Sequence, residues 1–214
     1  MLFLLCVSAL LWTSQGFAET YNVSVNENEE ITIQKQSDSN TVAFSDLSDN
    51  LQDGDIINFA EGTFKFPQCL QITKAVIING KDNKTILEGS DAFNHIIYVK
   101  ELDIDGEITI QNLKFQNGKA NIAPYTTDME DGGALHIGIP ASSKKMTVNV
   151  VSCDFSNNEA PFGSAASVNL LYRNSKNSID EIYFKNCTFS NNGTDKSTQS
   201  TVYAHYIATT FEKR

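Results

Sequence analysis

Hydrophobic residues in this chain occur in short runs separated by turn-forming residues. Seven runs are β-branched or alternate between apolar and polar residues, the pattern of a strand that buries one face. They cover residues 30–33, 55–59, 75–80, 95–99, 107–110, 146–150 and 181–184. No window keeps the 3.6-residue spacing of an amphipathic helix over three turns. The pattern therefore predicts an all-β protein.

A nine-residue sequence motif, which we call the phrase, occurs three times. Its copies are IQNLKFQNG at 110–118, VVSCDFSNN at 150–158 and FKNCTFSNN at 184–192. Within each copy, the apolar residues of the first half and those of the second half are out of phase by one residue. A bend between the halves puts both sets on the same side, and Asn tolerates the left-handed backbone that a sharp bend requires. Each phrase therefore predicts a strand, a corner at Asn112, Ser152 or Asn186, and a second strand.

The repeats are spaced too widely for a sandwich, whose strands recur roughly every 8 to 12 residues. Ile57, Ile77 and Ile97 recur at intervals of 20, and Phe155 and Phe189 are 34 apart. A period of about 20 or more, with several strands in each unit, indicates a solenoid. We expect stacked turns about 4.8 Å apart, with ladders of equivalent residues along the stack. The predicted ladder residues are Phe115, Phe155, Phe189, Asn112, Ser152 and Asn186.

The first eighteen residues contain no charge, are rich in Leu and Phe, and end in Gly16, Phe17 and Ala18. This is the pattern of a secretory signal peptide cleaved after Ala18. The alternative is a membrane anchor, but an apolar block of about twelve residues spans roughly 18 Å, short of the ~30 Å hydrocarbon core. We therefore expect a secreted or cell-surface protein whose mature chain has no membrane-spanning segment.

Composition and charge limit the kinds of binding partner that we expect. The chain of 214 residues has a net charge of −10 and a pI near 4.7. An acidic chain has little to attract phosphate backbones, so we expect no nucleic-acid partner. The length suits one domain at 19–214, with a cap region at 19–50, repeats at 51–200, and a last rung or tail at 201–214.

In a secreted protein, the cysteines are candidates for disulfides and the Asn-x-Ser/Thr patterns are candidates for glycosylation. Cys153 and Cys187 hold equivalent positions in two phrases, which makes them candidates for a disulfide or for a stacked pair of free thiols. Cys69 stays unpaired in both cases. The glycosylation patterns begin at Asn22, Asn83, Asn186 and Asn192. Asn186 is expected to pack in its corner, so the predicted glycosylation sites are Asn22, Asn83 and Asn192.

The motif Phe-x-x-Asn, present as FSNN at 155–158 and 189–192, together with GGALHI at 132–137 after the first phrase and GSAASV at 163–168 after the second, resembles the repeats of polymorphic outer membrane proteins. GDIINFAEGTF at 54–64 resembles the opening rungs of right-handed parallel β-helices of the pectate-lyase-like superfamily and of adhesin-like proteins. The resemblance implies a single-stranded right-handed parallel β-helix, which at 20 to 25 residues a turn has about eight rungs. We expect no C-terminal barrel of the kind that autotransporter passengers carry.

Few residues are candidates for metal binding or catalysis. Asp128, Glu130 and Asp131 form a weak candidate site for Ca²⁺, with a solvated turn as the alternative. His136 and His205 alternate with apolar neighbours, so we expect both on the surface and too far apart to share a zinc ion. No metal or other cofactor is predicted with any firmness, and no catalytic residue is identified.

Three functions follow from the resemblance. The first is a non-catalytic, adhesin-like protein that binds a glycan or protein on a host or cell surface. The second is a polysaccharide lyase or glycoside hydrolase, which needs Arg173 and carboxylates such as Asp128 and Asp131 in one cleft. The third is a fragment of a larger passenger. The sequence favours the first and leans against an enzyme.

Overall fold

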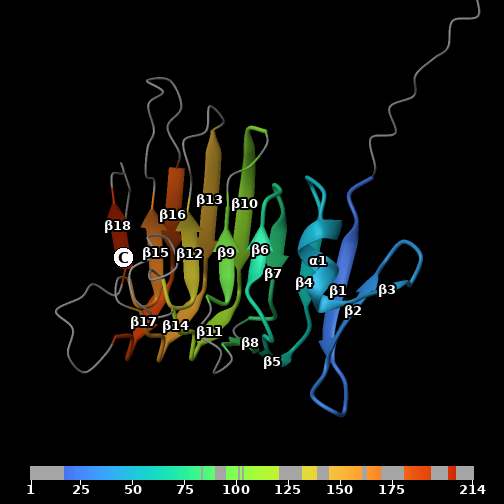
Figure 1. The fold of residues 1–214 in the computed structure, drawn as a ribbon, viewed down its shortest axis with the longest axis horizontal. Coiled ribbons are helices and arrows are strands. Elements are labelled where there is room, and N and C mark those ends of the chain that lie inside the picture. The colour runs from blue at the N-terminus through green and yellow to red at the C-terminus, as the bar shows by residue number, and fades with distance from the viewer. Residues whose placement is uncertain are drawn as a thin grey trace, which may run out of the picture.

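The computed structural model describes residues 17–82, 84–89, 95–100, 102, 104–120, 132–138, 145–160, 163–169, 181–193 and 202–205. The described chain is all-β with parallel sheets, as predicted, apart from one short helix (Figure 1). The largest sheet, sheet A, has eight strands in the order β16-β13-β10-β7-β4-β1-β2-β3. Its strands are β1 (Thr20–Val25), β2 (Ile31–Lys35), β3 (Thr41–Val42), β4 (Ile56–Phe59), β7 (Ile77–Asn79), β10 (Gly106–Gln111), β13 (Met146–Val151) and β16 (Glu181–Lys185).

Two smaller sheets have five strands each. Sheet B consists of β5 (Gly62–Lys65), β8 (Thr85–Glu88), β11 (Lys114–Gln116), β14 (Asp154–Ser156) and β17 (Thr188–Ser190). Sheet C consists of β6 (Leu70–Ile72), β9 (Ile97–Val99), β12 (Leu135–Gly138), β15 (Ala166–Asn169) and β18 (Val202–His205).

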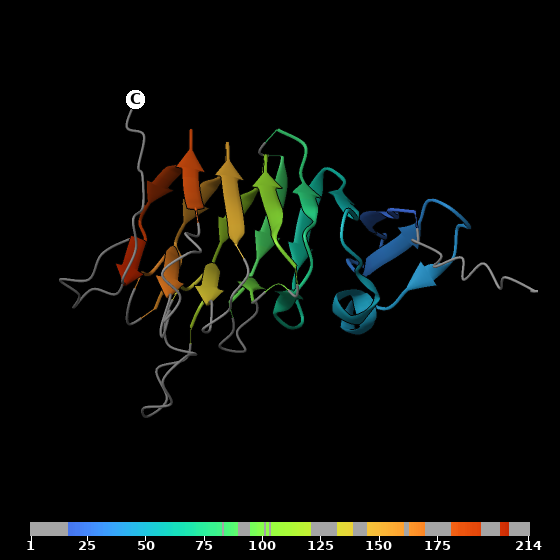
Figure 2. The same cartoon turned by 90° about the horizontal axis from the view of Figure 1, so that it is seen from above.

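From β4 onward, consecutive strands visit sheets A, B and C in turn. Five such triplets follow one another along the long axis of the molecule (Figure 2), and each strand pairs in parallel with its equivalent in the next triplet. This topology is compatible with the predicted parallel β-helix. Between two equivalent strands the chain passes through the other two sheets, so it returns to each sheet in the same direction and every pairing in these turns is parallel.

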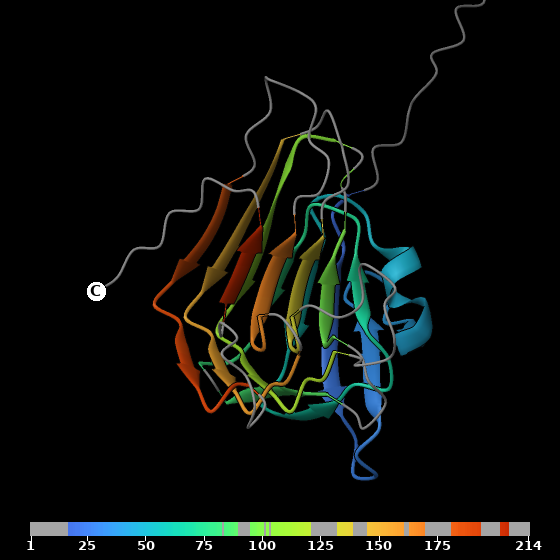
Figure 3. The same cartoon turned by 60° about the vertical axis from the view of Figure 1, so that its left-hand side comes forward.

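The N-terminal end of the stack is built differently. Strands β1, β2 and β3 continue sheet A, with β1 parallel to β4 and the β1–β2 and β2–β3 pairs antiparallel. Helix α1 (Phe44–Asn50) lies beside β1 and β2 (Figure 3) and buries Leu47. This is the region predicted to be a cap, although the short helix itself was not predicted because seven residues give no helical periodicity.

The three sheets enclose one hydrophobic core in which equivalent residues of successive turns lie in register. In sheet A, Ile78 pairs with Ile57 on one side and with Ile110 on the other, and all three are buried. In sheet B, the Phe155 ring stacks between Phe115, at 4.8 Å, and Phe189, at 5.1 Å between ring centroids. Stacked aromatic pairs contribute about 0.5–1.5 kcal/mol beyond the area they bury.

Two left-handed corners frame each of the last three sheet B strands. The first corner has φ values of 59° at Asn112, 52° at Ser152 and 53° at Asn186. The second has φ values of 57° at Asn117, 56° at Asn157 and 52° at Asn191. The first set occupies the positions predicted from the phase change. The second set was not predicted.

The spacing of the turns differs from the expectation. Ile57 pairs with Ile78 rather than Ile77, and Ile97 belongs to sheet C, so the interval of 20 does not mark equivalent positions. Side-chain contacts between equivalent positions are 21 residues apart at Asn58–Asn79, 32 at Asn79–Gln111 and 40 at Gly118–Asn158. Because the turns are this long, the described strands make five complete turns rather than about eight.

Candidate functional site

The outward face of sheet A carries a row of amide side chains. Asn58, Asn79 and Gln111 occupy equivalent positions on β4, β7 and β10. Asn79 Nδ2 donates to Asn58 Oδ1 at 2.9 Å, and Gln111 Nε2 donates to Asn79 Oδ1 at 2.7 Å. All three residues are half-buried. We call these three residues the amide row.

Every hydrogen bond in the amide row points in the same direction, toward the N-terminal cap. Each amide has two donor hydrogens and an oxygen with two lone pairs, so the internal bonds use only part of its capacity. The row fixes the side-chain conformations and leaves further donors and acceptors at the outer surface. It therefore presents preorganised amide groups at intervals of about 4.8 Å, the separation of neighbouring strands.

Polar and aromatic groups extend this face toward the last turn. Asn149 Nδ2 donates to Glu107 Oε1 at 2.6 Å, and Asn149 pairs in register with Tyr183. The Lys185 ammonium lies 4.6 Å from the centroid of the Tyr183 ring. Such a cation–π pair contributes about 0.5–1 kcal/mol at an exposed site. The face thus combines amides, carboxylates, an ammonium group and an aromatic ring.

The outward face of sheet C carries a different set, which we call the histidine cluster: His95, Tyr98, His136 and Ser167. His136 Nδ1 lies 2.6 Å from Ser167 Oγ, and His95 Nδ1 lies 2.8 Å from the carbonyl oxygen of Gly132. The two imidazole rings stack with centroids 4.9 Å apart, and the Tyr98 ring lies 4.8 Å from that of His136.

The prediction of a surface position for His136 was wrong. Its side chain alternates with Leu135 and Ile137, which places it on the outward face as expected, but only 1% of it is exposed. All four residues of β12 are buried, so both faces of sheet C are covered at this strand. Burial lowers the pKa of His95, which favours its neutral form. For His205, the structure describes the backbone in β18 and not the side chain.

Cys69, Cys153 and Cys187, the cysteines among the described residues, are free thiols. Cys153 and Cys187 occupy adjacent turns, and each Sγ donates to the end of the preceding sheet A strand, to Ile110 O at 3.6 Å and Val150 O at 3.5 Å respectively. A hydrogen bond with Cys187 and burial raise the pKa of Cys153. Burial raises the pKa of Cys69 to about 12. Cys69 and Cys153 are accordingly poor nucleophiles in the folded chain, whereas the hydrogen bond with Cys153 lowers the pKa of Cys187.

The Asn-x-Ser/Thr patterns are placed differently from the expectation. Asn192 does not project freely: its Oδ1 accepts from both Asn158 N, at 3.0 Å, and Asn158 Nδ2, at 2.9 Å, and its Nδ2 donates to Phe155 O at 3.0 Å. Asn186, expected to pack in its corner, is exposed. Asn22 is exposed on β1. Asn83 lies outside the described residues.

Several predicted site residues also lie outside the described part of the chain. They are Asp128, Glu130, Asp131 and Arg173. The structure therefore does not test the proposed Ca²⁺ site or the catalytic cleft that an enzyme would need. Among the residues that the structure does describe, no three His, Cys, Asp or Glu side chains gather closely enough to hold a metal ion.

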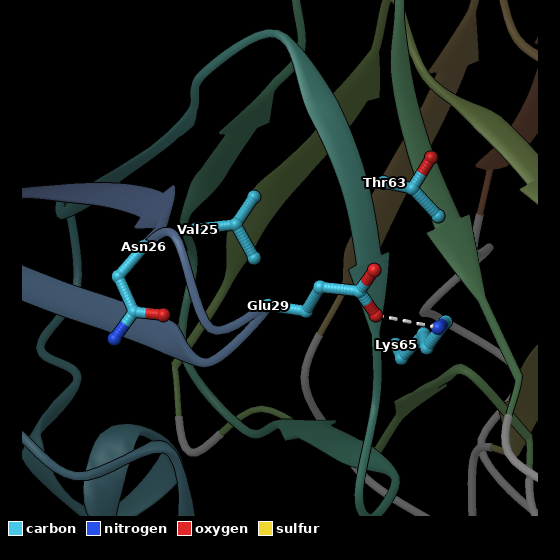
Figure 4. A pocket seen from close by; sticks show the side chains of 5 residues that line it. All are labelled: Val25, Asn26, Glu29, Thr63 and Lys65. Carbon is cyan, nitrogen blue, oxygen red and sulfur yellow. Dashed lines mark hydrogen bonds and ion pairs between the residues drawn. The ribbon is translucent and has the colours of Figure 1, made fainter.

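A shallow pocket of about 470 Å³ lies where the β1–β2 turn meets β5 (Figure 4). It is lined by Val25, Asn26, Glu29, Thr63 and Lys65. Lys65 Nζ and Glu29 Oε2 are 2.8 Å apart, and this contact lowers the pKa of Glu29 and raises that of Lys65. Both side chains are more than half exposed, so the pair adds little stability.

Comparisons of the chain with protein-family models, with curated proteins and with solved structures found no match. No helix in the described part of the chain combines the length and the apolar character that crossing a bilayer requires.

Proposed function

We propose that this chain is a secreted, non-catalytic β-helix protein of adhesin-like character, which binds a repeating polymer such as a surface glycan along the outward face of sheet A. The amide row carries the proposal. It offers amide groups of fixed orientation, repeated at the strand spacing, on a face that is open to solvent. A polysaccharide presents hydroxyl groups at regular intervals, and amides both donate to and accept from hydroxyls.

The architecture supports the proposal. The five strand triplets of the described chain fit a right-handed parallel β-helix of the pectate-lyase-like type, in which each turn contributes one strand to each sheet. A stack of this kind presents long, regular faces, and such faces suit an extended ligand. Tyr183 adds an apolar ring near the last turn, against which a sugar ring would pack.

The contrast between the faces supports the choice of sheet A. On the outward face of sheet C, His136 and Ser167 are buried in the histidine cluster. Sheet B carries shorter strands of three or four residues, whereas β10 and β13 in sheet A have six. Sheet A therefore offers the longest open face in the described chain.

The test is binding of the purified mature chain to a panel of acidic and neutral polysaccharides. The Gln111→Ala variant removes one end of the amide row, and loss of one ligand hydrogen bond of about 1–1.5 kcal/mol weakens binding roughly tenfold. The matched control is Gln116→Ala, which removes a glutamine of the same turn from sheet B, where it donates to Glu88 at 3.3 Å. If both variants bind like the parent chain, the face of sheet A is not the binding site.

The alternative is a polysaccharide lyase or glycoside hydrolase. It requires Arg173 and the carboxylates of 128 and 131 to converge. A turnover assay on acidic polysaccharides with added Ca²⁺ separates the two functions, because an adhesin-like protein leaves the polymer length unchanged. Polymer cleavage that Arg173→Ala abolishes would replace the binding proposal by the enzymatic one.

A further inference from the structure

The last corner of the described chain contains two patterns for N-glycosylation in close succession. They are Asn186-Cys187-Thr188 and Asn192-Gly193-Thr194. A glycan is attached to the amide nitrogen of the asparagine, in most secreted proteins before the chain has folded. The folded structure then decides whether the modified chain can adopt its native conformation.

A chain with a glycan on Asn186 can adopt its native conformation. It follows β16 at the first corner, where its φ of 53° turns the chain, and its side chain is exposed. No hydrogen bond of its side chain occurs among the described residues, so attachment of a sugar would break no contact there. Thr188, the third residue of the pattern, is exposed at the start of β17, and its hydroxyl donates to Asp154. A glycan here projects away from the stack.

A glycan on Asn192 would conflict with the native conformation. Both ends of its amide group contact the preceding turn: the oxygen accepts two hydrogen bonds from Asn158, and the nitrogen donates to Phe155 O. Asn158 is buried, and its own amide continues the series by donating to Phe115 O at 3.2 Å and accepting from Gly118 N at 2.8 Å. A sugar on Asn192 Nδ2 would push this amide away from the turn and deprive the buried Asn158 N–H of its partner, which would destabilise the modified fold.

We propose that Asn186 is an N-glycan acceptor of this protein and that Asn192 is a structural residue that carries no glycan; the proposal rests on the secretion included in the proposed function. The co-substrate is a lipid-linked oligosaccharide pyrophosphate. The Asn186 Nδ2 forms a bond to the anomeric carbon of the first sugar, the bond from that carbon to the pyrophosphate oxygen breaks, and the amide proton passes to a base of the transferase. The lipid pyrophosphate leaves with the electron pair, so no oxidant or reductant is involved.

The experiment expresses the full chain in a eukaryotic secretory host in two forms, one with its own first eighteen residues and one with these replaced by an established signal peptide. Both forms carry an appended Asn-Gly-Thr tag as a control for access to the transferase. Secreted protein is treated with the amidase that converts each glycosylated Asn to Asp, and peptides are read by mass spectrometry. The expected result is conversion at Asn186 and at the tag, with Asn192 unchanged.

Two variants remove the Asn186 pattern by different routes, so that a folding defect in one does not decide the outcome. Asn186→Asp keeps a residue that tolerates the left-handed corner, and Thr188→Val keeps a β-branched strand residue. Each should lose one glycan. The matched control, Thr194→Val, removes the Asn192 pattern without altering Asn192 and should lose none.

Conversion of the tag without conversion of Asn186, or conversion of Asn192 in protein that remains folded, overturns the proposal. The two leader forms keep this outcome separate from secretion. If the chain is glycosylated only with the replaced leader, the acceptor assignment stands and the proposed secretion fails.

Discussion

The outward faces of sheets A and C belong to the same turns of one chain, yet their polar side chains differ in burial. On sheet A, the amide row is half-buried and bonded side by side along the stack. On sheet C, His136 and Ser167 are 1% and 0% exposed, and they bond to each other. A polar group that keeps its contact with water costs little to leave unpaired, whereas a buried one depends on its partner. The difference separates a face suited to recognition from one that contributes to stability.

The strongest test of this contrast is His136→Ala. The substitution removes a buried ring, leaves a cavity beside His95 and deprives Ser167 Oγ of its contact. Large-to-small changes of this kind cost about 2–4 kcal/mol, and an unpaired buried hydroxyl adds to the loss. Urea denaturation of the variant and the parent chain measures the change. A loss below about 1 kcal/mol would mean that the cluster is not a packed part of the fold.

Gly138→Ala tests the packing of the same cluster by adding volume. A methyl group at Gly138 would lie 2.7 Å from His136 Nε2 and 3.0 Å from the Tyr98 hydroxyl. Overpacking typically costs about 1–3 kcal/mol. If the contact with His136 is the cause, the double variant Gly138→Ala/His136→Ala should be more stable than the sum of the two single effects predicts. Strict additivity would contradict the packing described here.

A smaller effect should appear in the pH dependence of stability. Burial lowers the pKa of His95, so between that pKa and the ordinary value of about 6.5 the unfolded chain binds more protons than the folded one. Stability should therefore be fully present above about pH 6.5 and fall as the pH decreases toward the folded-state pKa. Unfolding free energies measured between neutral and mildly acidic pH should show a weaker slope for His95→Gln. An unchanged slope would assign the dependence to other groups.

The smallest effect on stability is expected on sheet A. Gln111→Ala should change the free energy of unfolding by no more than about 0.5 kcal/mol, because its amide can exchange one half-exposed hydrogen bond for water. Thermal and urea denaturation check this with the same protein used for binding. A loss comparable to that of His136→Ala would remove the distinction between the two faces.

Much of the fold was accessible from the sequence. Each of the seven predicted runs coincides with a strand, and the phase change within the repeated phrase located corners at Asn112, Ser152 and Asn186 because a strand can bury only alternate residues. The repeated Asn at 117, 157 and 191 was a visible signal for the second corner that went unused. The predicted interval of 20 residues was wrong because the turns differ in length. It matched Ile77 to Ile57, whereas the partner of Ile57 is Ile78.

The candidate site was less accessible. Alternation placed His136 on the outward face of a strand, but alternation does not tell what covers that face. The amide row could not be found without the register, because Asn58, Asn79 and Gln111 recur at unequal intervals of 21 and 32 residues. The packing of the Asn186 and Asn192 side chains was predicted wrongly because a hydrogen bond to the preceding turn depends on the second corner, which was not predicted.

The paired corners also bear on how a chain of this kind can change over evolutionary time. The second left-handed position follows the first by five residues in each of the last three turns, from Asn112 to Asn117, Ser152 to Asn157 and Asn186 to Asn191. The remainder of each turn varies in length while the strands stay in register. Insertions and deletions should therefore accumulate outside the corner segment, and duplication of a complete unit would lengthen the stack by about 4.8 Å without disturbing its neighbours.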